Sequence, residues 1–380
     1  MFDDDGICTS CRVEEEFQKL SPDFWKHREE KFKQLIESYR CKDGSNYDCI
    51  IAVSGGKDSY YQTHIITQEY NLKPLLVTYH GNNYLPEGQG NLDRMREVFN
   101  ADQCVFGPSV DVLKKLNRIC FKKMGDMNWH CHAGIKIVPM IAAVKYNIPI
   151  VVWGETTWSI AGMFSPDDYV EYNKRTVMEH DLRGFTWQDM LGEEALKPRD
   201  LTWLRFPSDE SIDRVGVRGV YIGNYFKWDP NQHTNLVESR YRFEKARQPF
   251  ERTYRMMSNL DDMHENGIHD YMKFIKFGYG RASDHASKDI RSGYLSRNEG
   301  IEVVKKYDHV KPQRDLNRWL DYVEMQEHEF DQIADEFRDP RVWWIERGLW
   351  WKNNLWGEPS SYGSVMLRDD SKINRYLRTH

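Results

Sequence analysis

The sequence predicts an α/β protein built on a doubly wound parallel sheet. Short apolar runs rich in β-branched residues alternate with helical patterns between residues 48 and 153, and this alternation is typical of parallel strands covered by helices on both faces. The first apolar run ends in a glycine-rich turn, Ser54-Gly55-Gly56, directly ahead of a helical pattern. We expect a cysteine-containing segment before this core and a helical C-terminal region after it.

The elements follow in order along the chain. Ser21-Pro22 is a helix-capping pattern, and Phe24, Phe32 and Ile36 behind it form an apolar stripe at helical spacing. The predicted strands are 49–53, 74–79, 104–106 and 148–153. The later predicted helices are 59–70, 91–100, 109–123, 135–146 and 326–337.

The composition favours a cytoplasmic protein. The chain has 380 residues, 40% of them hydrophobic, and no apolar run approaches the length of a membrane span. Its acidic start, MFDDDGICTSC, lacks the regions of a signal peptide. A formal net charge of -6 argues against general nucleic-acid binding. The aromatic content of 13% favours a large core and is compatible with a homodimer interface.

The stretch SGGKDS, residues 54–59, predicts an anion site. Its glycines allow a tight turn, the following helix directs unpaired N–H groups and a positive dipole end at that turn, and Lys57 adds a full charge. A Walker A loop is excluded because Ile51 stands where that motif needs glycine. Ligands of such sheets bind beyond the carboxyl ends of the strands, which are here 54–59, 78–82 and 154–155.

SGGKDS resembles the pyrophosphate loop of the PP-loop ATP pyrophosphatases, enzymes that cleave ATP between the α and β phosphates and adenylate a substrate oxygen. The alternative is a glycine-rich turn without a ligand. The resemblance implies a PP-loop ATPase, HUP-like fold with a cysteine-containing segment and helix (1–45), a nucleotide-binding core (46–160), an insertion covering the site (161–253) and a helical substrate and interface region (254–380).

Three cysteines are candidate zinc ligands. Cys8 and Cys11 are separated by two residues, a spacing at which one turn can hold a zinc ion, and Cys131 can add a third thiolate. Seven unevenly spaced cysteines favour thiols or metal ligands over disulfides. Two alternatives stay open, namely ordinary thiols near a terminus and, for His130 and His132, local hydrogen bonding.

The stretch 264–297 combines glycines with cations. Such a segment can hold a diphosphate through bidentate arginine contacts, and the candidates are Lys276, Arg281, Lys288 and Arg291. The alternative is a solvated charged face. We interpret five tryptophans further along as core or dimer contacts rather than a sugar platform: Trp343, Trp344, Trp350, Trp351 and Trp356.

Four features together resemble the N-acetyl sugar amidotransferases of bacterial surface-polysaccharide and lipopolysaccharide O-antigen biosynthesis, a branch of the PP-loop superfamily. They are the GxCxxC start, SGGKDS, the strand end IPIVVWGE and the block KFGYGRASDHASKDIRSGYLSRNEGI. The resemblance extends from Gly6 to about Phe337 and is weakest over 160–250. Relatives are expected to carry a further CxxC pair upstream of Cys8, so this chain favours zinc ligation by Cys131 with a histidine over a four-cysteine site.

The resemblance implies ATP-dependent conversion of an acetamido group to an acetamidine. The carbonyl oxygen attacks the α-phosphorus of ATP, pyrophosphate leaves, and ammonia then displaces AMP. Catalytic roles would fall to Lys57, Asp58 and Glu155, with Asp58 either holding Mg²⁺ or capping the helix. The implied contacts are Ser54, Gly55, Gly56, Lys57, Asp58 and Ser59 for pyrophosphate, Thr78, Tyr79 and His80 for the nucleoside, and Gly154 and Glu155 near the reacting carbonyl.

The implied substrate is a UDP-linked N-acetyl sugar, and the implied cofactors are ATP, Mg²⁺ and zinc. A separate glutaminase subunit is expected to supply ammonia, because none of the seven cysteines has a GxCxG setting and position two is Phe2. Two rival functions stay open. A PP-loop tRNA-modifying enzyme would share the ATP chemistry, and a non-catalytic module would bind ATP without cleaving it.

Overall fold

The computed structural model describes residues 3–155 and 164–377, which form two compact units. The first unit comprises Met1–Pro108, Cys131–Leu191 and Lys197–Lys245, and the second comprises Ser109–His130, Gly192–Leu196 and Ala246–His380. The chain thus passes from one unit to the other more than once, whereas the four predicted segments are consecutive. None of the helices in residues 3–155 and 164–377 combines the length and the apolar character that a membrane span requires.

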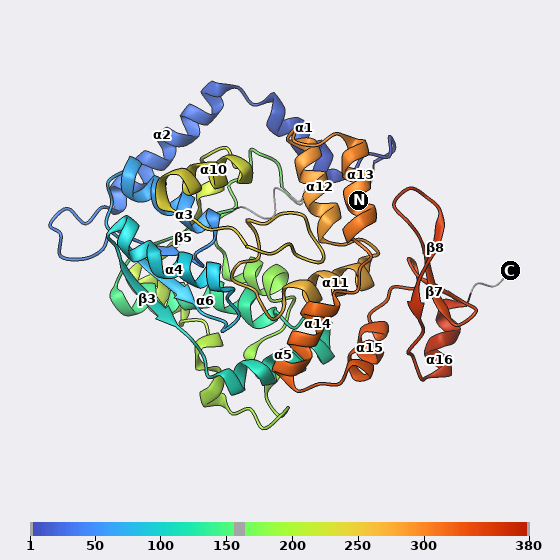
Figure 1. Ribbon diagram of the computed structural model, residues 1–380. Coiled ribbons are helices and arrows are strands. Elements are labelled where there is room, and N and C mark those ends of the chain that lie inside the picture. Colours follow the sequence, from blue (N-terminus) through green and yellow to red (C-terminus); the bar gives the residue numbers. More distant parts are fainter. Residues whose placement is uncertain (1–2, 156–163, 378–380) are drawn as a thin grey trace. The chain divides into compact units, whose positions relative to one another are not determined.

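The first unit contains a five-stranded parallel sheet with the strand order β3-β2-β1-β4-β5, of which Figure 1 labels the two outer strands, β3 and β5. The α/β class and the four predicted strands are confirmed. The fifth strand lies within 161–253, where the sequence predicted only an insertion. The strands are β1 (Cys49–Ala52), β2 (Pro74–Tyr79), β3 (Asp102–Phe106), β4 (Ile150–Trp153) and β5 (Arg218–Tyr221).

The order of the strands reverses at β1. Strands β2 and β3 follow on one side of β1, and β4 and β5 follow on the other, so that Ile50 is paired with Leu75 of β2 and with Val151 of β4. Right-handed crossovers in these two directions place their helices on opposite faces. The sheet is therefore doubly wound, with its switch point between β1 and β4, where ligands of such sheets bind.

The helices of the first unit begin at positions that the sequence marks. Ser21 Oγ accepts a hydrogen bond from Phe24 N at 3.2 Å at the predicted cap, and the helix behind it buries Phe32 and Ile36. The helices wholly or mostly in this unit are α1 (Thr9–Lys19), α2 (Pro22–Tyr39), α3 (Lys57–His64), α4 (Pro86–Phe99), α6 (Trp129–Tyr146), α8 (Lys174–Thr176), α9 (Asp209–Val215) and α10 (Pro230–Tyr241).

The second unit is mainly helical but also contains a three-stranded antiparallel sheet, β6 (Trp344–Glu346), β7 (Leu349–Asn353) and β8 (Pro359–Ser364). The predicted helical C-terminal region did not include this sheet, because its strands are short and have no regular alternation. The helices are α5 (Val110–Met124), α11 (Asn266–Phe277), α12 (Arg281–Arg291), α13 (Arg297–Tyr307), α14 (Gln313–Val323), α15 (Glu327–Glu336) and α16 (Asp370–Ile373).

Aromatic side chains form much of the core of the second unit. Trp319 packs edge-on against Phe330, with ring centres 5.8 Å apart. Trp343 and Trp350 are fully buried in the same cluster, which confirms the prediction of a core role for these two tryptophans. Trp356, by contrast, is 42% exposed.

Candidate functional site

The turn after β1 holds SGGKDS between a strand and a helix, as predicted. Gly55 has φ 79°, in the left-handed region, and a Cβ at this position would lie 2.8 Å from the backbone of Leu92 in α4. The position therefore requires glycine. Ser59 Oγ accepts a hydrogen bond from Ser54 N at 2.9 Å, so the two ends of the turn are held together.

The N-terminus of α3 has no side-chain cap. Its N-cap residue is Gly56, which has no side chain to accept hydrogen bonds from the first turn, and the first N–H groups of a helix have no partner within it. These N–H groups and the positive end of the helix dipole favour a negative charge. The turn also lies at the carboxyl end of β1, beside the switch point of the sheet.

Lys57 and Asp58 form an ion pair in the first turn of α3, with Lys57 Nζ 2.6 Å from Asp58 Oδ2. The other carboxylate oxygen, Oδ1, lies 3.5 Å from His233 Nδ1 of α10. Burial by itself would raise the pKa of Asp58, but Lys57 and His233 outweigh burial and hold this pKa below its usual value. Asp58 is therefore a carboxylate with a nitrogen donor opposite each oxygen.

The end of β2 offers one partly exposed side chain beside the turn. Thr78 is buried and accepts a hydrogen bond from Gln103, and the buried ring of Tyr79 stacks on Trp203 with the ring centres 4.9 Å apart. His80 is only half-buried. Of the three predicted nucleoside contacts, His80 alone presents a ring outside the core, so Thr78 and Tyr79 would contact a nucleoside through their backbone.

The end of β4 is covered by a tryptophan that the sequence did not single out. A Cβ on Gly154 would lie 3.1 Å from Trp228 Cη2 and 3.3 Å from Gln62 Oε1. Glu155 follows Gly154 and is the last described residue before 164.

Four polar atoms around this site are buried and have no hydrogen-bond partner among the described residues. They are Asp58 Oδ1, Gln62 Oε1, Trp228 Nε1 and His233 Nδ1. Buried polar groups are normally paired, since an unpaired one costs about 1–3 kcal/mol. Sequence reasoning missed the last three residues. Gln62 lies in α3, outside the SGGKDS motif, and WDPNQH, residues 228–233, contains a helix start but no motif spacing. These four atoms can therefore form hydrogen bonds with a ligand or with water.

The predicted zinc ligands belong to the first unit. Cys8 Sγ and Cys11 Sγ are 3.5 Å apart, and Cys131 Sγ accepts from Asn83 Nδ2 at 3.7 Å. Two thiolates of one tetrahedral zinc, each about 2.3 Å from the metal, stand roughly 3.8 Å apart. The spacing of Cys8 and Cys11 therefore fits half of a zinc site, and zinc binding stays a prediction.

His130, next to Cys131, takes the alternative role of local hydrogen bonding. It is fully buried in the second unit, and its Nε2 lies 3.1 Å from Asn117 Nδ2 and 3.3 Å from Glu265 Oε1. Trp319 Nε1 donates to Asn117 Oδ1 at 2.8 Å in the same network. These contacts join α5, α14 and the start of α6, so His130 has a structural explanation.

The four predicted diphosphate contacts lie in the second unit, with Lys276 on α11 and the other three on α12. Lys276 Nζ donates to Gly125 O at 3.0 Å, and Arg281 Nε donates to Asp270 Oδ1 at 2.8 Å. Arg291 Nη1 donates to Ser287 Oγ at 2.8 Å. The remaining candidate is Lys288. At least three of these cations thus already bind protein acceptors, and a diphosphate contact stays a prediction for all four.

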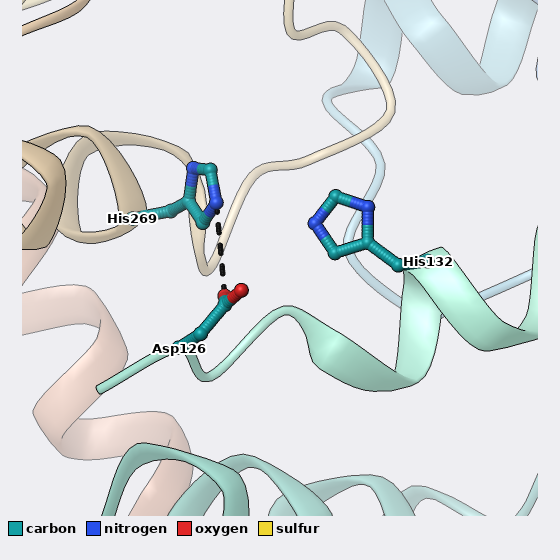
Figure 2. Close-up of side chains that lie close together, drawn as sticks. All are labelled: Asp126, His132 and His269. Atoms are coloured by element: carbon teal, nitrogen blue, oxygen red, sulfur yellow. Dashed lines mark ion pairs between the residues drawn. The ribbon is translucent and has the colours of Figure 1, made fainter. Parts of the chain in front are cut away.

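A chain of ion pairs supports the arginine at the start of α12. His269 Nε2 lies 3.6 Å from Asp126 Oδ1 (Figure 2), and His269 Nδ1 lies 3.7 Å from Asp270 Oδ1. Burial by itself would raise the pKa of Asp270, but Arg281 and His269 outweigh it and hold this pKa below its usual value. His132, also drawn in Figure 2, belongs to the first unit.

One segment of the chain is similar to a known protein family. Residues 238–355 match the family model described as LPS biosynthesis protein WbpG-like, C-terminal domain. This match indicates a family of LPS biosynthesis proteins for that segment. An uncharacterized protein of Methanocaldococcus jannaschii is 34% identical over 71 residues, which are 19% of this chain and 24% of that protein. The similarity therefore spans about a quarter of that relative.

Proposed function

We propose that this protein is an ATP-dependent amidotransferase that converts an acetamido group of a UDP-linked N-acetyl sugar to an acetamidino group. The observation that carries the proposal is the turn at residues 54–59, an uncapped helix start with a lysine beside the switch point of a doubly wound sheet. The match of residues 238–355 to LPS biosynthesis proteins supports a substrate from that chemistry. A PP-loop fold and ATP cleavage are parts of the proposal.

The reaction has two steps. The acetamido carbonyl oxygen attacks the α-phosphorus of ATP, which forms an O–P bond and breaks the bond to pyrophosphate. Ammonia then adds to the imidate carbon, the C–O bond breaks, AMP leaves, and one proton is released. The protein contributes mainly orientation and stabilisation of phosphate charge.

The residues of the turn would bind the leaving pyrophosphate. The first N–H groups of α3 point to the anion, and Lys57 Nζ, which here binds Asp58 at 2.6 Å, would turn to the phosphate oxygens. His80 at the end of β2 would lie near the nucleoside, and Gly154 and Glu155 at the end of β4 near the reacting carbonyl. Lys276, Arg281, Lys288 and Arg291 stay candidate contacts of the UDP diphosphate.

Two metal ions belong to the proposal. Both oxygens of Asp58 face nitrogen atoms, of Lys57 and His233, so the residues do not form a carboxylate site for Mg²⁺ in this arrangement. Mg²⁺ would therefore be bound by the phosphates of ATP. Zinc would be held by Cys8 and Cys11, whose sulfur spacing fits the donor set, with Cys131 as a proposed third ligand, and would fix the start of α1.

A mass-spectrometric assay tests the proposal. The protein is incubated with a UDP-diacetamido sugar, ATP, Mg²⁺ and ammonium, and we expect a product lighter by the difference between an oxygen atom and an NH group. One pyrophosphate and one AMP should form for each product molecule. Without ammonium, sugar-dependent exchange of labelled pyrophosphate into ATP should remain, because adenylation precedes attack by ammonia.

Other outcomes separate the alternatives. Release of inorganic phosphate without pyrophosphate would overturn the proposal. AMP release stimulated by tRNA and not by UDP-sugars would favour a tRNA-modifying enzyme, and ATP binding without cleavage would favour a non-catalytic module. Turnover with glutamine in place of ammonium by this chain alone would contradict the separate glutaminase subunit that we propose as ammonia source.

A further inference from the structure

A histidine of α10 faces the carboxylate of Asp58 in the turn. The side chain of His233 is 3% exposed, and its Nδ1 lies 3.5 Å from Asp58 Oδ1. Neither atom has a hydrogen-bond partner among the described residues. The separation is longer than the roughly 2.7–3.2 Å of an N–H···O hydrogen bond. The two atoms therefore lie opposite each other without a full hydrogen bond.

Aromatic contacts fix the ring of His233 in this position. It stacks on Tyr61 with the ring centres 3.5 Å apart and an angle of 12° between the planes. Trp228 packs edge-on against the same ring, with the centres 4.6 Å apart and an angle of 86°. Since Tyr61 and Asp58 belong to the same helix, α3, the stack sets His233 against the turn.

A long hydrogen bond at the other ring nitrogen favours one tautomer. The backbone N–H of Asp229, the N-cap residue of α10, donates to His233 Nε2 at 3.4 Å. A nitrogen that accepts a hydrogen bond carries no proton, so the proton of the neutral ring is on Nδ1. His233 thus directs an N–H donor at Asp58 Oδ1.

The other oxygen of Asp58 binds Lys57, the lysine that is proposed to bind the pyrophosphate. Lys57 Nζ donates to Asp58 Oδ2 at 2.6 Å, and a pyrophosphate group at the N-terminus of α3 would compete for the same ammonium group. Once Lys57 turns to the phosphate, Asp58 needs a donor at Oδ1, the carboxylate oxygen that is buried although a third of the side chain is exposed, because a buried charged oxygen without a partner is costly. His233 Nδ1 is the donor placed opposite its second oxygen.

We propose that His233 is a positioning residue of the pyrophosphate site, whose Nδ1–H bonds Asp58 Oδ1 when Lys57 leaves Oδ2 to bind the anion. The inference rests on the proposed function for the identity of that anion. His233 does not touch the anion and acts through Asp58. Without it, Asp58 would retain Lys57, and the charge that develops on the leaving pyrophosphate would be less well stabilised.

Four variants test this role. His233→Phe keeps an aromatic ring for the stack on Tyr61 but has no donor. His233→Asn places an amide N–H near the position of Nδ1, whereas His233→Gln places its amide near Nε2. Tyr241→Phe is the matched control, because it removes a hydroxyl of α10 that bonds buried His64 of α3 away from the turn.

The measurements are kcat and KM for ATP in pyrophosphate formation, the Kd of inorganic pyrophosphate by calorimetry, and the melting temperature. We expect His233→Phe to lower kcat and weaken pyrophosphate binding about tenfold or more, because a hydrogen bond to a charged group is lost, with a smaller change in KM. His233→Asn should recover most of both losses and His233→Gln little. Tyr241→Phe should lower the melting temperature and leave kcat within about twofold.

The other possible results would contradict either the positioning role of His233 or the proposed function. If folded His233→Phe keeps the wild-type kcat and pyrophosphate affinity, or if Tyr241→Phe loses as much as His233→Phe, the positioning role is wrong. If His233→Phe does not fold, equal values for the Asn and Gln variants overturn the role. If wild type forms no pyrophosphate with any substrate, the proposed function fails, while pyrophosphate binding by the variants still tests His233.

Discussion

Two helices of this chain begin with the same residue types but differ in the negative charge that lies at their N-termini. Helix α3 has Gly56 at its N-cap followed by Lys57, and α12 has Gly280 at its N-cap followed by Arg281. Both starts combine N–H groups that have no partner within the helix, a positive dipole end and a cation, an arrangement that favours a negative charge.

At α12 the protein supplies this negative charge itself. Asp308 Oδ2 accepts a hydrogen bond from Gly280 N at 2.7 Å, and its Oδ1 accepts from Ser283 N at 3.0 Å. Arg281 binds the buried carboxylate of Asp270 at 2.8 Å. The start of α12 is therefore satisfied by two internal carboxylates, which weakens the case for Arg281 as a diphosphate contact.

At α3 the carboxylate of the turn does not cap the helix. Gly56 has no side-chain cap, and Asp58 binds the side chain of Lys57 instead of the N–H groups. A glycine followed by a cation at a helix start thus predicts a bound anion, but it does not predict whether that anion is a carboxylate of the protein or a ligand. We infer that the external anion binds at α3.

Among the variants considered, removal of Lys57 should have the largest effect on pyrophosphate formation. In Lys57→Ala we expect kcat for pyrophosphate formation to fall about 10²–10³-fold, the range for loss of a group that stabilises developing charge. Initial rates of pyrophosphate release measure the effect, and circular dichroism checks the fold. Lys305→Ala is the control, since Lys305 pairs with exposed Glu302 on α13 and should keep the wild-type rate. A Lys57→Ala rate above half of wild type would contradict the assignment.

The features that the sequence predicted correctly depend on residues that are close together in the chain. The first four strands, the turn at 54–59 and the cap at Ser21 follow from apolar runs, glycines and capping residues that lie within a few positions of one another. The contact of His233 with Asp58 and the capping of Gly280 by Asp308 join residues far apart in the chain. Local patterns contain no information on such pairs, so the sequence predicted an anion both at the turn of residues 54–59 and among the cations of residues 264–297.

Removing Asp308 should destabilise the second unit. Asp308→Ala leaves the N–H groups of Gly280 and Ser283 without their acceptor in a buried position. We expect a loss of about 2–4 kcal/mol in the free energy of unfolding, the range for breaking a buried charged network. Chemical unfolding followed by tryptophan fluorescence measures it. Glu302→Ala, at an exposed ion pair, should change stability by less than about 0.5 kcal/mol, and equal effects of both variants would refute the capping role.

Two adjacent glycines of the α3 turn should differ in their tolerance of alanine. Gly55→Ala requires φ 79° and places a Cβ 2.8 Å from the backbone of Leu92, so we expect a loss of about 1–2 kcal/mol from the left-handed conformation alone. Gly56→Ala has φ -73°, and the nearest atom to its Cβ is Ser54 Oγ at 3.4 Å. It should lose less stability than Gly55→Ala in urea unfolding. The reverse order would show that the turn has a different backbone.

Lys352 is a buried cation that, unlike Lys57 and Arg281, donates to a backbone carbonyl, Asn353 O at 2.6 Å, instead of to a carboxylate. Burial lowers the pKa of Lys352 from 10.5 to about 8. Between these two values the unfolded chain holds a proton that the folded protein has released, so the free energy of unfolding should rise with pH in this window and gain nothing from this group below it. Urea unfolding across the window should show this rise in wild type and a smaller rise in Lys352→Met, which has no charge to bury. Identical pH profiles would mean that the ammonium finds a charged partner, as Arg281 does.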